Sequence, residues 1–178
     1  MKEIENFIST YNDYLKEKIK LFNDVEFILK KNDLDASSYE NPIFYFLEAF
    51  KFPTTYNYSG FCFINHSVPI RKDFIHFATH MDYNMLYVYC FDDGRVYLWD
   101  EEYNRFEWYC SESLSIFFES MCLVMQTKNE MIRTGSWDLD QGYLKKVFRY
   151  CLDLNGGKKE YEIFYDHILG IDDNTNEL

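Results

Sequence analysis

The chain has 178 residues and a formal net charge of −12, and 47% of its residues are hydrophobic, 20% aromatic and 27% charged. This composition is typical of a folded globular protein with a single domain, 1–178, and it excludes a disordered chain. The excess of acidic residues argues against nucleic acid and anionic lipid as partners, because both are bound through lysine and arginine, and it suits a cationic protein partner.

The first predicted element is a helix over residues 2–31. Apolar side chains recur there at the spacing of one helix face, without glycine or proline to interrupt them. They are Ile4, Phe7, Ile8, Tyr11, Leu15, Ile19, Phe22 and Leu29. Asn23 and Asp24 are a candidate break in this run, and residues 32–39 are predicted to form a polar connector.

A second helix is predicted to begin at Asn41 and Pro42, with asparagine as the N-cap and proline at the first helical position. The stretch 54–60 is rich in threonine, tyrosine and asparagine and is predicted to be a loop. Short strands are predicted at 61–64 and 74–78.

The stretch 85–100 carries the strongest local signal, because two aromatic and β-branched runs are separated by Asp92, Asp93 and Gly94. Such a pattern predicts a β-hairpin, and Gly94 can adopt the positive φ that its turn requires. Alternation along the first strand places Met85, Tyr87, Tyr89 and Phe91 on one face and Leu86, Val88 and Cys90 on the other. Both faces are largely apolar, so the hairpin is predicted to lie near the centre of a sheet.

Residues 105–110 predict one more strand. Ser111 or Ser113 can then cap a helix that ends near residue 126, and 127–135 are predicted to be a polar connection.

A further helix is predicted to begin at Ser136, with carboxylates in its first turn, and to end at Asn155, Gly156 and Gly157. A short helix over 158–169 then stops at Gly170.

This order of elements predicts an α+β fold. N-terminal helices would precede a central antiparallel sheet of about four to six strands, and C-terminal helices would pack on it. The core would span about 41–126, with a helical extension at about 136–170.

Acidic and aromatic residues alternate around the predicted hairpin and the strand after it. Exposed tyrosine and tryptophan beside carboxylates would suit the binding of a basic protein. The alternative is that the aromatics belong to the core and the acids keep a sheet edge soluble. The candidate partner-binding residues are Asp92, Asp93, Trp99, Asp100, Glu101, Glu102 and Trp108.

Catalytic and metal sites have weak support in the sequence. His76 and His80 are four residues apart, a spacing that could hold a metal on a helix and would share a face on a strand, but their neighbours are those of a core strand. Cys90 or Cys110 could pair with a histidine as a nucleophile, yet a thiol in an apolar strand is normally inert. The sequence has no Gly-x-Ser-x-Gly elbow and no glycine-rich phosphate loop, so no catalytic residue, cofactor or metal is predicted.

The cysteines are widely spaced and odd in number, with no Cys-x-x-Cys pair; they are Cys62, Cys90, Cys110, Cys122 and Cys151. This usage favours free thiols in a reducing compartment. The N-terminus lacks the features of a signal peptide, and no apolar run reaches the ~20 residues of a membrane span. A cytoplasmic protein that does not bind membranes is therefore expected.

The sequence Val-Tyr-Cys-Phe-Asp-Asp-Gly-Arg-Val-Tyr-Leu-Trp-Asp at 88–100, followed by Ser-Leu-Ser-Ile-Phe-Phe-Glu-Ser at 113–120, resembles the core of the SUKH superfamily. Residues 69–78 resemble the strand that precedes this core, and 41–50 resemble the family's early helix. The glycine that the family usually has after that helix is missing, and the helical part after Gly135 is longer than expected.

The resemblance implies an α+β fold without a catalytic centre. It also implies an immunity protein that blocks a polymorphic toxin, often a basic nuclease or nucleic-acid deaminase. The leading hypothesis is therefore a protein-binding immunity module with a cationic toxin domain as its partner. The alternatives are a regulatory or scaffold module with the same fold, or a small metal- or Cys/His-dependent hydrolase.

Overall fold

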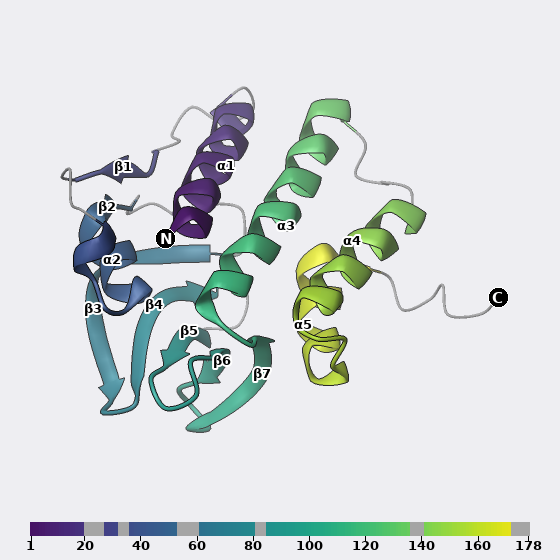
Figure 1. Cartoon of the computed structure of the whole chain (residues 1–178). Coiled ribbons are helices and arrows are strands. Elements are labelled where there is room, and N and C mark those ends of the chain that lie inside the picture. The colour runs from purple at the N-terminus through teal and green to yellow at the C-terminus, as the bar shows by residue number, and fades with distance from the viewer. Residues whose placement is uncertain (20–26, 32–35, 53–60, 81–84, 136–140, 172–178) are drawn as a thin grey trace.

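The computed structural model describes residues 1–19, 27–31, 36–52, 61–80, 85–135 and 141–171 (Figure 1). The helices are α1 (Lys2–Ile19), α2 (Pro42–Ala49), α3 (Leu114–Thr134), α4 (Gln141–Leu154) and α5 (Glu162–Leu169), with 3-10 turns η1 (Ala36–Ser38) and η2 (Lys159–Tyr161). The strands are β1 (Leu29–Lys30), β2 (Phe50–Lys51), β3 (Phe61–Arg71), β4 (Phe74–His80), β5 (Met85–Cys90), β6 (Val96–Asp100) and β7 (Arg105–Ser111). The predicted loop at 54–60 and the predicted cap Ser136 lie outside the described residues.

The predicted α+β class is confirmed. Strands β3 to β7 form one five-stranded sheet in which each strand pairs antiparallel with the next along the chain. Helices α1 and α2 precede the sheet strands, and α3, α4 and α5 follow them. In Figure 1, α1 and α3 lie side by side above the sheet, and α4 and α5 lie beyond α3.

The predicted hairpin is present as β5 and β6. Gly94 has φ 74° and donates its N–H to the carbonyl of Cys90 at 3.0 Å, so the glycine takes the left-handed conformation that the turn requires. Pairing of Tyr87 with Leu98 and of Val88 with Tyr97 sets the register.

The main core lies between the sheet and the helices. Tyr87 and Leu98 point from the hairpin into it, and Phe118 of α3 meets Phe46 of α2 with ring centroids 4.7 Å apart. The aromatic residues that are numerous in the composition are therefore mostly packed here, where large rings bury the most apolar area.

A second, smaller core occupies the other face of the sheet. It consists of Phe74, Leu86, Val88, Cys90, Tyr97 and Trp99, with Phe106 packed against them. Phe74 on β4 and Phe106 on β7 have ring centroids 5.0 Å apart, although three strand spacings of a flat sheet would measure ~14 Å. The sheet therefore curls around these rings and covers this face with its own side chains.

Three predicted boundaries are wrong by more than two residues. The short strand predicted at 61–64 continues as β3 to Arg71. Leu29 and Lys30 form strand β1, paired with β2, so the helical run does not reach residue 31. Helix α3 begins as predicted, with Ser113 accepting the Ile116 N–H at 3.2 Å, but it continues through the predicted polar connection to Thr134. The polar residue Thr127 is accommodated inside the extended helix, because its buried hydroxyl donates a hydrogen bond to the Leu123 carbonyl.

Candidate functional site

The seven candidate partner-binding residues do not form one surface. Asp92 and Asp93 lie in the turn between β5 and β6, whereas Asp100, Glu101 and Glu102 lie at the turn between β6 and β7. The two turns are at opposite ends of β6, whose five residues span ~17 Å. The acidic residues that were predicted to form one surface therefore lie in two separate turns, one at each end of β6.

At the β6–β7 turn, the backbone is held by local hydrogen bonds. The carboxylate of Asp100 accepts the Tyr103 N–H at 3.1 Å, and Asn104 takes a positive φ of 52°. This geometry projects Glu101, Glu102 and Tyr103 into solvent, and the Tyr103 side chain is 65% exposed. The carboxylates of the two glutamates form no ion pair or hydrogen bond with another described residue.

Arg105 follows this turn, with its guanidinium 5.3 Å from the Tyr103 ring centroid. Its charge is compensated by Glu107, at 2.9 Å. The turn thus presents an exposed aromatic ring directly after two carboxylates that have no partner among the described residues. We refer to Glu101, Glu102 and Tyr103 as the acidic turn.

At the β5–β6 turn, Asp93 is occupied within the protein. Its carboxylate accepts the Arg95 N–H at 3.0 Å and the Tyr97 hydroxyl. Partial burial alone would raise the pKa of Asp93, but these hydrogen bonds outweigh that effect, and the pKa is lowered. Only Asp92 of this pair extends into solvent without a partner among the described residues.

The two candidate tryptophans face opposite sides of the sheet. Trp99 is 3% exposed within the second core, so it offers almost no surface to a partner. Trp108 is half-buried on the helix side, with its ring 5.0 Å from that of His167 on α5. Alternation along antiparallel strands accounts for this split.

Two aromatic residues that sequence reasoning did not select as site residues, Phe44 and Phe91, form an exposed pair near Asp92. Their rings stack with centroids 5.9 Å apart, and each side chain is 39% exposed. Asn41 links α2 to the sheet here through a 3.4 Å hydrogen bond to the Tyr89 hydroxyl. The pairing joins residues 47 positions apart, so no local pattern could predict it.

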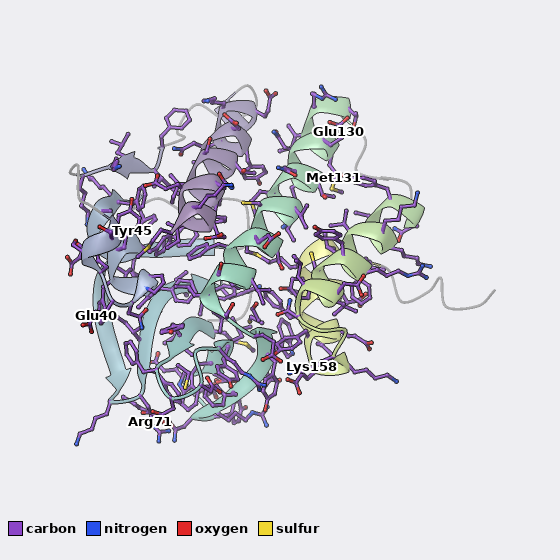
Figure 2. All side chains as sticks on the ribbon, viewed as in Figure 1. Glu40, Tyr45, Arg71, Glu130, Met131 and Lys158 are labelled. Carbon is purple, nitrogen blue, oxygen red and sulfur yellow. The ribbon has the colours of Figure 1, made fainter. Side chains whose placement is uncertain are left out.

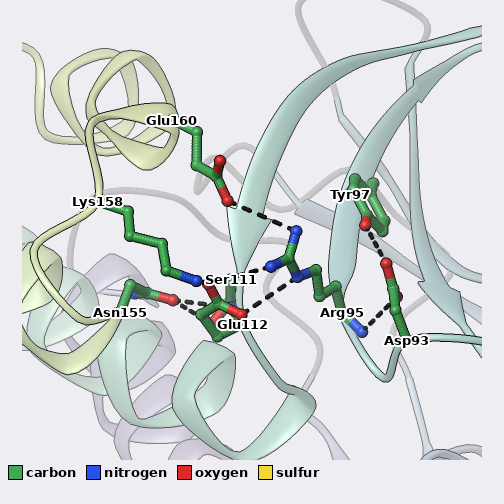
Figure 3. Close-up of polar contacts among 8 residues, drawn as sticks. All are labelled: Asp93, Arg95, Tyr97, Ser111, Glu112, Asn155, Lys158 and Glu160. Carbon is green, nitrogen blue, oxygen red and sulfur yellow. Dashed lines mark hydrogen bonds and ion pairs between the residues drawn. The ribbon is translucent and has the colours of Figure 1, made fainter.

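A polar cluster joins the sheet to the C-terminal helices (Figure 3). Arg95, immediately before β6, donates to the Glu112 carboxylate at 3.1 and 3.4 Å and approaches Glu160 at 3.5 Å. Lys158 binds the same Glu112 carboxylate. Partial burial would raise the pKa of Glu112, but its hydrogen bond with Lys158 and the charge of Arg95 lower it. Each charge in the cluster has a partner, so the cluster fixes structure.

Asn155 anchors this junction from inside. It is fully buried and accepts the Ser111 hydroxyl and the Glu112 N–H, both at 2.9 Å. Its amide donates to the Cys151 carbonyl at 2.8 Å and to the Tyr165 hydroxyl at 3.0 Å. One side chain thus ties the end of β7 to α4 and α5.

His76 and His80 do not share a face, contrary to the strand alternative considered from the sequence. An irregularity in the pairing of β4 and β5 between His76 and Ala78 shifts the alternation. His76 lies opposite Val88 and contacts Thr79, 3.3 Å away, whereas the His80 ring packs near Tyr87 on the helix side. One metal ion cannot be bound by both residues in this arrangement.

The buried cysteines are poor nucleophiles in this setting. Burial raises the pKa of Cys90 and, to a larger extent, that of the fully buried Cys110. Burial likewise raises the pKa of Cys151, to about 12. A thiol with a raised pKa is protonated at neutral pH and does not react as a thiolate.

A polar groove of about 470 Å³ runs between α1 and α3. It is lined by Lys2, Glu3, Asn6, Ser9, Thr10, Glu119, Cys122 and Gln126. Over the part of the chain that the structure describes, no three His, Cys, Asp or Glu side chains are grouped to hold a metal ion. No helix in that part has the length and apolar character to span a membrane.

Comparison of the chain with models of protein families, with curated proteins and with solved structures gave no match. The resemblance to the SUKH superfamily therefore stays a prediction, and the function has to be argued from the surfaces of the molecule itself.

Proposed function

We propose that this protein is a non-catalytic binding module that neutralises a cationic protein, and that it is an immunity-type protein whose partner is a toxin domain. The observation that carries the proposal is the acidic turn, where the 65% exposed ring of Tyr103 lies beside two carboxylates without described partners. An exposed tyrosine with free acids beside it suits arginine and lysine on a partner.

The charge of the whole chain supports the same partner. A net charge of −12 accelerates the approach of a basic protein and disfavours acidic competitors. The narrower proposal, a toxin domain, rests on the resemblance of residues 88–100 and 113–120 to the SUKH core.

The raised pKa values of the buried thiols and the opposite faces of His76 and His80 support binding over catalysis. They count against the two arrangements considered for a hydrolase, namely a nucleophile at Cys90 or Cys110 and a metal bound by both histidines.

The test uses the protein encoded by the neighbouring reading frame as the partner and measures association by surface plasmon resonance over a series of salt concentrations. The double substitution Glu101→Lys with Glu102→Lys is expected to slow association by about tenfold or more at low salt and to weaken its salt dependence. Tyr103→Ala is expected mainly to speed dissociation.

A matched control is Asp13→Lys with Glu130→Lys, which changes the net charge equally. Both acids belong to exposed ion pairs on helices α1 and α3, of little value to stability (Figure 2 labels Glu130 at the far end of α3). Equal effects of the two double variants would reject the acidic turn as the binding surface. A neighbouring gene of metabolic function would count against the toxin proposal.

A further inference from the structure

Helix α4 has an exposed face whose charge is opposite to that of the chain. Its buried side is made by Leu144, Val147, Cys151 and Leu152. Successive residues are 100° apart around the helix axis, so the positions away from this buried side lie within an arc of ~160° that has Lys145 at one edge and Tyr143 at the other. That arc contains Gly142, Tyr143, Lys145, Lys146, Arg149, Tyr150 and Asp153, which we call the α4 cationic face.

The cations of this face have no ion-pair partner among the residues that the structure describes. Lys145, Lys146 and Arg149 form no ion pair or hydrogen bond with any other described residue. Asp153 is the single acid on α4, so the helix carries three positive charges against one negative in a chain of net charge −12. Elsewhere, exposed Lys16 and Arg133 each have an acidic partner within their own helix.

Two aromatic rings flank these cations. Tyr143 is 42% exposed and Tyr150 is 53% exposed, and they lie seven residues apart, so they stand two turns from each other on one side of the helix. Neither ring packs against another described aromatic ring. Exposed tyrosine together with arginine is a combination enriched in protein interfaces.

We propose that the α4 cationic face is a second docking surface, and that its occupant is an acidic segment of a partner protein. The positive charges of the face favour an acidic ligand, and the two exposed tyrosine rings favour a polypeptide, whose side chains can pack on them. The proposal is independent of the acidic turn, which has the opposite charge and lies on a different element.

Other anionic ligands fit the face less well. A nucleic acid or an anionic bilayer is an extended polyanion and would be repelled by the remainder of a chain with net charge −12. A bilayer also needs aliphatic or tryptophan side chains to insert, and the α4 cationic face has only Tyr143 and Tyr150 as large apolar groups. An acidic peptide segment is short enough to touch α4 alone.

The probe is a labelled synthetic peptide rich in aspartate with one tryptophan, and the readout is fluorescence anisotropy with the full chain. Lys146→Glu is expected to weaken binding by about tenfold, because it reverses a contacting charge. Lys72→Glu is the matched control: it reverses an exposed lysine in the β3–β4 turn and is expected to change affinity by less than about twofold. Tyr150→Ser should also weaken binding of the peptide.

Several outcomes would overturn the proposal. The first is an absence of saturable peptide binding, and the second is an equal loss of peptide affinity in Lys146→Glu and Lys72→Glu. The third is tighter binding of an oligodeoxythymidine or of phosphatidylserine vesicles than of the peptide. Self-association that Lys146→Glu abolishes would assign the face to a second copy of the chain. Failure of this test leaves binding at the acidic turn unaffected, since that surface is mapped with a cationic partner and with variants at Glu101 and Glu102.

Discussion

The replacement Asn155→Ala tests whether one buried amide holds the C-terminal helices to the sheet. The Asn155 side chain makes four hydrogen bonds, with Ser111, Glu112, Cys151 and Tyr165. Each bond contributes about 1 kcal/mol net, and the Ser111 and Tyr165 side chains are fully buried, where water cannot readily replace the lost partner. The variant is therefore expected to lose about 4 kcal/mol of unfolding free energy.

The assay is urea denaturation followed by circular dichroism and by tryptophan fluorescence. With a slope of about 2 kcal/mol per molar urea for a domain of this size, the midpoint should fall by about 2 M. Ser111→Ala removes a single one of the four bonds and should cost about 1 kcal/mol. The double variant should lose less unfolding free energy than the sum of the two single losses, because Ser111 and Asn155 share one hydrogen bond. A loss below about 1 kcal/mol for Asn155→Ala would refute the reasoning.

Three further predictions concern the sheet, the polar cluster and the thiols. Gly94→Ala should lower the free energy of unfolding by about 1 kcal/mol in the same assay. The added Cβ would lie 3.8 Å from the Tyr89 hydroxyl without a clash, so the positive φ is the one source of the loss. A loss above about 3 kcal/mol would contradict this. The lowered pKa of Glu112 stabilises the fold above the unfolded-state pKa of about 4.3, and that stability disappears as the pH falls through the folded pKa. Glu112→Gln should therefore be less stable than the wild type at pH ~7. In urea titrations the difference in unfolding free energy between the two proteins should decrease as the pH is lowered, and a difference that does not change with pH would argue against a lowered pKa of Glu112. In the native protein a thiol reagent should modify the half-buried Cys62 well before the fully buried Cys110, and mass mapping that showed the reverse order would contradict the described burial.

The features that the sequence predicts correctly are those encoded by adjacent residues. Asn41 caps α2 with its side chain, Ser113 caps α3, and Gly94 turns the hairpin with positive φ. Each depends on the chemistry of one residue and its immediate backbone, so a local pattern is sufficient.

The features that the sequence could not reveal depend on distant contacts. The curl of the sheet brings Phe74 to Phe106, and the irregularity at His76 reverses which side His80 faces. The acidic residues were predicted as one surface because they are close in sequence, yet β6 separates them into two ends. Tyr103 could have been selected from its place directly after Glu101 and Glu102 in a turn, whereas the stacking of Phe44 on Phe91 required the fold.

The position of the C-terminal segment has a consequence for the behaviour of the sheet. Strand β7 is one of the two outermost strands, and η2 and α5 pack against it. An uncovered outermost strand offers unpaired amides and carbonyls to any other extended chain, which makes it a nucleus for aggregation. The C-terminal segment thus protects this edge strand through η2 and α5. A chain truncated before residue 141 is expected to lose solubility as well as stability.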